Sequence, residues 1–208
     1  MSITANSRNS RNLIVVPRGD LSIEFANTVA WRGSTPTESL YTCDDVLAWV
    51  ASTKVLPVRP VAELRKWFEA RPADATMLFS DAIEIRETLY RLLHCVASAS
   101  APTSEDLRRL NRALSAASPR VSLDFAGTGF GWRIEAKPTA VGILAPVLWS
   151  AADILVGPDS ARVRECANNR CLWLFLDDSK NGTRRWCSMQ ACGNRAKAHR
   201  HYLRQKEK

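Results

Sequence analysis

The stretch CANNRCLWLFLDDSKNGTRRWCSMQACGNR, residues 166–195, holds four of the six cysteines and decides how the C-terminal part of the chain folds. Four residues separate Cys166 from Cys171, four also separate Cys187 from Cys192, and fifteen lie between the two pairs. Two close cysteine pairs joined by a longer loop are typical of a tetrahedral zinc site. Because four thiolates fill its coordination sphere, we predict one structural zinc that folds this module. Two disulfides, or four thiols without a metal, are the alternatives.

The positive charge of the chain is concentrated around and after these cysteines. Residues 162–208 contain twelve Lys or Arg and four Asp or Glu, a net charge of +8. The whole chain of 208 residues also has a net charge of +8 (29 minus 21), so residues 1–161 sum to zero (17 minus 17). A neutral body with a basic tail predicts a surface that binds a polyanion such as DNA. A solvated basic helix without a partner is the alternative. The predicted nucleic-acid contacts are Arg184, Arg185, Arg195, Lys197, Arg200 and Arg204.

Composition divides the chain into three segments. Residues 1–12 are rich in Ser and Asn and are predicted to be a flexible tail, residues 13–160 a helical body, and residues 161–208 a zinc finger. The longest uncharged stretch, residues 138–152, is too short to span a bilayer, so no membrane association is expected. The N-terminal segment lacks the apolar run of a secretory signal. A cytoplasmic, reducing location is therefore expected, which favours zinc over disulfides.

Apolar residues recur at helical spacing through most of the body. The predicted helices are residues 21–31, a helix capped by Thr42, one starting at Pro60, residues 73–99, a helix from Thr103 to about 118, and residues 139–156. Pro146 predicts a kink or a later start in the last of these, which we expect to be the central helix of the core. A strand at 12–16 and a hairpin formed by 121–125 and 132–136 complete the body. The predicted fold class is mainly α (α+β).

The finger has its own pattern of short elements. Strands are predicted at 162–166 and 172–176, on either side of the first cysteine pair. A polar turn follows at 177–183. Ser188 is well placed to cap a basic C-terminal helix over residues 189–205. The module is thus expected to consist of two cysteine loops, a short hairpin and a helix. The loop at 166–171 is called the first knuckle and the loop at 187–192 the second.

Several side chains of the finger have two interpretations. Asp177 and Asp178 are adjacent carboxylates, but directly after a strand we interpret them as turn residues and not as a catalytic pair. Gly193 is expected to bring its backbone amide close to a ligand sulfur. Two histidines of the last helix could replace a cysteine, although four thiolates already suffice; they are His199 and His201. The aromatic residues are predicted to fill the small core of the finger, with stacking on RNA bases as the alternative; they are Trp173, Phe175 and Trp186.

The body shows no pattern of an enzyme. It has no His-Glu-x-x-His motif, and its glycine cluster at 127–131 has the wrong spacing for a phosphate loop. His94 is expected to be a packed histidine, and Cys43 and Cys95 small buried residues. Three polar residues lie in otherwise apolar stretches and are expected either to satisfy one another in the core or to line a pocket; they are Asn27, Arg86 and Glu87.

The C-terminal segment resembles the CGNR-type zinc fingers. The resemblance rests on Cys166-x4-Cys171, Trp173-x-Phe-x-Asp177 and Arg185-Trp-Cys-Ser-Met-x-Ala-Cys-Gly-Asn-Arg195-x-Lys197. The body is similar to the ABATE domain that precedes this finger, through Leu21-Ser-Ile-Glu-Phe-Ala-Asn-Thr28, Asp45-Val-Leu-Ala-Trp49 and Ile85-Arg-Glu87. The resemblance implies a stress-related bacterial transcription regulator whose four cysteines bind zinc and whose finger binds DNA.

Residues and resemblance together favour a DNA-binding transcription regulator. The alternative is a protein- or RNA-binding adaptor in which the finger is purely structural. One short basic helix rarely gives a specific nanomolar site, so a homodimer is expected on DNA. A small-molecule ligand of the body is a further partner that the sequence leaves open. No enzymatic activity is expected.

Overall fold

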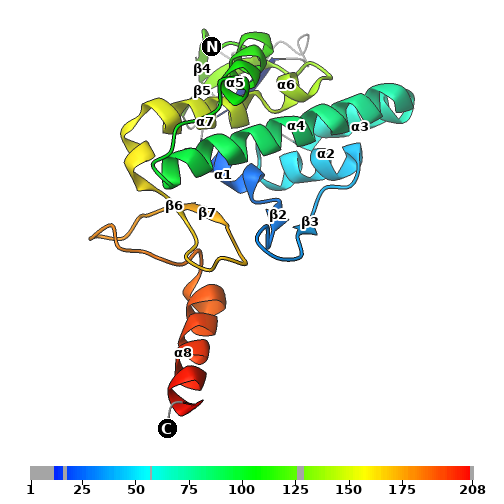
Figure 1. Cartoon of the computed structure of the whole chain (residues 1–208). Helices are drawn as coiled ribbons and strands as arrows, with labels where there is room; N and C mark the ends of the chain where they lie inside the picture. The colour runs from blue at the N-terminus through cyan, green and yellow to red at the C-terminus, as the bar shows by residue number, and fades with distance from the viewer. Residues whose placement is uncertain (1–11, 16–17, 57, 126–128, 207–208) are drawn as a thin grey trace.

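The computed structural model describes residues 12–15, 18–56, 58–125 and 129–206. The body is built around α4 (Pro72–Ala97), the long helix that crosses it in Figure 1. The other body helices all contact α4: they are α1 (Leu21–Ala26), α2 (Cys43–Ser52), α3 (Val58–Glu69), α5 (Ser104–Ala116), α6 (Ala140–Ile143) and α7 (Ala145–Val156). A 3-10 turn at 158–162 leads to the finger, which hangs below the body and ends in α8 (Asn194–Lys206). The predicted architecture, a mainly helical body followed by a small cysteine module, is confirmed.

Side-chain caps start three of the body helices where the sequence predicts them. Thr42 accepts a hydrogen bond from the backbone N–H of Asp45, and the Asp45 carboxylate accepts one from the N–H of Thr42 in return. Thr103 and Thr139 accept equivalent bonds at the starts of α5 and α6. Each cap satisfies an amide that the first helical turn leaves without a partner, which explains why these predicted starts hold.

Two predicted helices are shorter than their apolar patterns. α1 ends at Ala26 and not at residue 31, because Thr28 donates its hydroxyl to Phe25 O (2.9 Å) and the chain turns into β2 (Val29–Ala30). The segment predicted at 139–156 is two helices that meet at Leu144. Pro146 lies in the first turn of α7, where its missing N–H costs no hydrogen bond, so the later start is the outcome.

The sheets are small and antiparallel. β5 (Phe130–Glu135) is the middle strand of three and pairs with β1 (Asn12–Val15) on one side and β4 (Leu123–Phe125) on the other. The predicted hairpin is therefore confirmed, but its second strand begins at Phe130, inside the predicted glycine turn at 127–131, and residues 127–128 of that turn lie outside the described residues. β2 pairs with β3 (Thr37–Glu38), and in the finger β6 (Val163–Glu165) pairs with β7 (Leu174–Leu176). Both finger strands are shorter than predicted.

The core of the body is apolar around α7 and carries one buried cation. Val147 and Leu148 on α7 have no exposed surface, so the prediction that the last body helix is central to the core is confirmed. Arg86 is only 3% exposed and binds both carboxylate oxygens of Glu38, at 2.7 and 2.8 Å. Its Nε also donates to Glu87 (2.9 Å), so Arg86 and Glu87 do satisfy one another.

Other body predictions are corrected. His94 is not packed: its side chain is 44% exposed and its Nδ1 lies 2.7 Å from Glu165 Oε2, because α4 runs beside β6. Cys43 and Cys95 are only half-buried, since each lies near an end of its helix. Among the described residues, no helix combines the length and the apolar character needed to cross a membrane.

Candidate metal centre and basic helix

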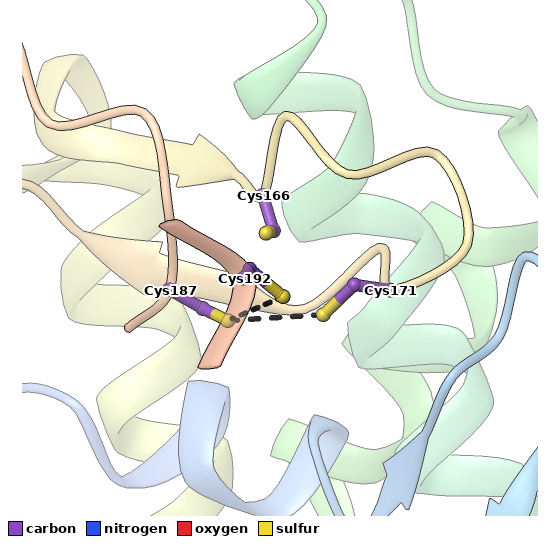
Figure 2. A group of neighbouring side chains, drawn as sticks. All are labelled: Cys166, Cys171, Cys187 and Cys192. Atoms are coloured by element: carbon purple, nitrogen blue, oxygen red, sulfur yellow. Dashed lines mark hydrogen bonds between the residues drawn. The ribbon is translucent and has the colours of Figure 1, made fainter. Parts of the chain in front are cut away.

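The four cysteines converge on one point between the body and α8. Cys166 and Cys171 flank the loop that joins β6 to β7, whereas Cys187 and Cys192 lie on the segment that leads into α8 (Figure 2). The four Sγ atoms lie within 4.8 Å of one another. Cys171 Sγ is 3.7 Å and Cys192 Sγ 3.8 Å from Cys187 Sγ. Cys166, Cys171 and Cys192 are buried, so the cluster is shielded from water.

This spacing fits a zinc ion. Sulfurs placed about 2.3 Å from a central zinc in a tetrahedron lie about 3.8 Å apart, which agrees with the two distances given above. A disulfide needs sulfurs about 2.05 Å apart, and all four cysteines are free thiols. The alternative of two disulfides is therefore wrong, and the four cysteines can bind one zinc ion.

The acid–base chemistry of the cluster agrees with a cation. Hydrogen bonds from the Cys187 thiol and from the backbone N–H groups of Cys187 and Asn168 lower the pKa of Cys166. Sharing that proton with Cys166, together with burial, raises the pKa of Cys187, and burial raises that of Cys171. Four thiolates this close repel one another, so a divalent cation is needed before all four can be deprotonated together.

Asn168 orients the metal ligands in a way that the sequence analysis did not find. Its side-chain amide donates to Cys192 Sγ at 3.4 Å, while its Oδ1 accepts from the N–H of Arg170 (3.1 Å). A polar residue two positions after a knuckle cysteine is the signal that could have indicated it. Gly193 does not play the predicted role, since its N–H donates to Ser188 O. A Cβ added to Gly193 would lie 2.8 Å from Met189 Sδ, so a larger residue would displace the Met189 side chain.

Arg184 and Asp177 hold the turn between the two knuckles. The Arg184 guanidinium donates to the carbonyls of Cys187 (2.5 Å) and Trp186 (3.0 Å) and covers the Phe175 ring. The buried carboxylate of Asp177 accepts hydrogen bonds from Ser179 and from the backbone N–H of Arg184. These bonds lower the pKa of Asp177, and the bond from the Ser179 hydroxyl has the largest effect. Asp177 is therefore a turn residue, as predicted. The guanidinium of Arg184 is thus bound inside the finger.

Two of the three aromatic residues of the finger pack against the four cysteines. Phe175 is buried beside Cys166, Cys171 and Cys192, and Trp186 packs against the same group. Trp173 is different, because 36% of its surface is exposed and its indole N–H donates to Asn27 O (3.0 Å). It joins the finger to the body and does not fill the finger core.

The finger is docked on the body through hydrogen bonds and a close backbone contact. The Asn27 side chain donates to Leu174 O (2.8 Å) and accepts from Leu174 N–H (3.1 Å), so it pairs with β7 as a neighbouring strand would. The side chain of Asn27 therefore hydrogen-bonds to the finger and not to Arg86 or Glu87. This corrects the expectation that the three residues satisfy one another in the core. On the other side, a Cβ added to Gly33 would lie 1.9 Å from Asn169 O, so the body loop and the first knuckle touch backbone to backbone.

The described basic side chains at the start of α8 face solvent. Figure 1 shows α8 extending away from the body, with its C-terminal end far from the other elements. Arg185, Arg195 and Lys197 are exposed, and no described carboxylate forms an ion pair with them. Arg195 lies over the Trp31 ring (4.5 Å), which fixes the start of the helix. Arg200 and Arg204 follow on the same helix.

A cavity of about 300 Å³ lies in the body between α4, α5 and α7. Ile85, Leu89, Leu110 and Leu148 give it apolar walls, and Asp81 lines it as well. This volume is at the lower end of the range for small-molecule sites, about 300–1,000 Å³. A small-molecule ligand of the body stays a prediction.

Fold and site together define a class of protein, a helical domain that carries a four-cysteine zinc finger. A family model described as ABATE, “Putative stress-induced transcription regulator”, matches residues 19–158, and a model of the CGNR zinc finger matches residues 162–205. The chain therefore belongs to the ABATE family, as the resemblance implied. Neither model describes an enzyme family. No curated protein matches the chain.

Proposed function

We propose that the protein is a DNA-binding transcription regulator that uses α8 as its contact element. The observation that carries this proposal is the placement of α8: it projects away from the body, and among the described residues no carboxylate forms an ion pair with its Arg195 or Lys197. An α-helix fits the major groove of B-DNA, and Lys and Arg along it neutralise phosphates. The proposed contacts are Arg185, Arg195, Lys197, Arg200 and Arg204, because the guanidinium of Arg184 is already bound within the finger.

We further propose that two copies act together on DNA. α8 has only thirteen residues, about three and a half turns, all of which follow the last cysteine. Such a helix reads few base pairs alone, and proteins of this type reach specificity by placing two recognition helices on adjacent half-sites. Residues 1–161 have a net charge of zero (17 minus 17), so self-association through the body meets little overall electrostatic repulsion. Regulation as such, and the non-enzymatic nature of the chain, are part of this proposal.

Salt-dependent binding tests the proposal. Fluorescence anisotropy with a labelled duplex is measured between 50 and 300 mM salt. Neutralisation of about five phosphates gives a log–log slope of roughly −4 to −5. The double variant Lys197→Glu, Arg200→Glu is expected to lose measurable binding. A matched control, Arg59→Glu, Arg108→Glu, changes the net charge equally on the exposed surface of the body and is expected to keep it.

Three results would contradict the proposal. They are absence of duplex binding at low salt, equal loss in both double variants, and binding that prefers single-stranded RNA or a protein over duplex DNA. The last result would instead support the adaptor function, in which the finger only presents a docking helix. Zinc content is determined for every variant, so that a loss of the metal is not mistaken for a loss of contacts.

A further inference from the structure

A groove of about 700 Å³ runs between the body and the finger at the start of α8. One wall is the body loop that follows β2, with Trp31, Ser34 and Thr35; the other is the first knuckle, including Asn169 and Arg170. Arg195, at the start of α8, also lines it. Residues of both the body and the finger are needed to form the groove.

The walls of the groove are held in place by unusual local structure. Trp31 has a positive φ of 59°, a conformation that costs a non-glycine residue energy and persists only where its surroundings enforce it. Ser34 donates its hydroxyl to Arg170 O (3.3 Å), across the groove wall. The backbones of Gly33 and Asn169 lie in direct contact beside it. The groove is thus bordered by a strained residue, a hydrogen bond and a close backbone contact.

The charged residues that line the groove are all positive. Two arginines, Arg170 and Arg195, belong to a lining that includes no carboxylate among the described residues. Amide and hydroxyl groups lie between them, and the rings of Trp31 and Trp186 form apolar surface. Cations together with hydrogen-bonding groups suit a phosphate, and indole rings beside them suit a planar base.

We propose that this groove binds a nucleotide, with its phosphate on Arg170 and Arg195 and its base against the tryptophan surface. The favoured source of the nucleotide is a nucleic-acid strand that α8 engages at the same time, so this inference builds on the proposed function. The body would then take part in nucleic-acid binding through the loop at 31–35, and the contact would reach beyond the finger.

Arg170→Ala tests the groove with little risk to folding, because among the described residues the Arg170 side chain has no partner within the chain and only its backbone is used. With duplex DNA, the variant is expected to bind five- to tenfold more weakly and to lower the salt slope by about one unit, as expected for one lost phosphate contact. Arg170→Lys should restore most of the slope. Arg59→Ala, on the exposed surface of α3, is the control and should leave both values unchanged.

A second arm uses thymidine monophosphate and follows tryptophan fluorescence. If the wild type binds duplex and Arg170→Ala keeps its affinity and slope, the groove inference is overturned while the proposed function stands. If duplex does not bind but the mononucleotide does, and Arg170→Ala abolishes that binding, the groove is a free-nucleotide site and the DNA-binding function fails. If neither ligand binds the wild type, both proposals are overturned.

Discussion

Arg86 is the residue on which the polar core of the body depends. Its buried guanidinium joins Glu38 on β3 to Glu87 on α4, and Arg32 binds Glu87 from the other side. Removal of one partner of a buried ion pair leaves a charge without compensation, which costs more than the pair itself contributes. We expect Arg86→Met to lower the free energy of unfolding by about 3 kcal/mol, the lower end of the range for such a loss, since Glu38 is partly exposed. Urea unfolding measures it, and Arg108→Met, in an exposed pair, should leave the midpoint nearly unchanged.

The same ion pair makes the stability of the body sensitive to acid. Burial alone would raise the pKa of Glu38, but hydrogen bonds from Arg86 and from the backbone of Leu40 and Ser39 hold it below the ordinary value. A pKa that is lowered by folding contributes stability that is present above the unfolded value, near 4.5, and lost as the pH falls through the native value. Unfolding free energies between pH 6 and 3 should therefore fall less steeply in Arg86→Met than in the wild type. An equal slope in both proteins would show that Glu38 is not coupled to Arg86.

Asn168 is the residue next to the metal with the clearest separable role. Asn168→Asp keeps the acceptor for the Arg170 N–H but replaces the donor to Cys192 Sγ with a carboxylate. Groups that orient metal ligands are worth about 10- to 100-fold in affinity when removed, so we expect the zinc affinity to fall by that factor in a chelator competition. Asn181→Asp makes the same charge change on an exposed turn of the finger and should not alter it. Comparable affinities in the two variants would contradict the role of Asn168.

At the scale of elements, the sequence predicts helix starts better than helix ends. Thr42, Thr103 and Thr139 mark the starts of their helices. A side-chain cap involves residues only three positions apart, so it can be recognised in the sequence. The end of α1 depends on the turn at Thr28 and on the pairing of β2 with β3, two strands of two residues each that carry no strong pattern of their own. The metal ligands could also be predicted, because the two cysteines of each pair are separated by only four residues. The docking through Asn27 and Gly33 was not predictable, because a single polar or small residue in a loop does not indicate what it meets after folding.

The backbone contact at Gly33 gives the sharpest test of how the elements dock. Its φ lies outside the left-handed region, so alanine is compatible with the backbone itself, but the new Cβ would lie 1.9 Å from Asn169 O. We expect Gly33→Ala to push the first knuckle away from the body, and hydrogen exchange at the Leu174 amide, bound by Asn27, to become at least tenfold faster. Gly19→Ala is the control, because nothing lies within 4 Å of its added Cβ. Unchanged exchange in Gly33→Ala would mean that the knuckle accommodates the methyl group without moving.

At the scale of the whole molecule, body and finger share apolar packing as well as hydrogen bonds. Ile23, Leu93 and Ile154 of the body form one buried cluster with Val163 and Leu174 of the finger. The metal holds only the cysteine end of the finger, while this cluster holds β6 and β7 against α1 and α4. The orientation of α8 relative to the body is thus determined by two independent attachments, and the groove between them exists only while both hold.

Removal of zinc should therefore weaken the body and not only the finger. Without the metal the thiolates repel one another and the finger loses its fold, so Val163 and Leu174 leave the shared cluster. Burial of two such side chains contributes about 3–6 kcal/mol as an upper estimate, and each kcal/mol shifts the midpoint by about 2–4 °C in a domain of this size. Near-ultraviolet circular dichroism should show the melting of the body about 10 °C lower in excess chelator, with recovery on addition of zinc but not of magnesium. In Asn27→Ala, where the docking is already weakened, the chelator should lower the midpoint less. An unchanged body midpoint in the wild type would mean that the finger is a tethered module, and that α8 has no fixed direction relative to the body.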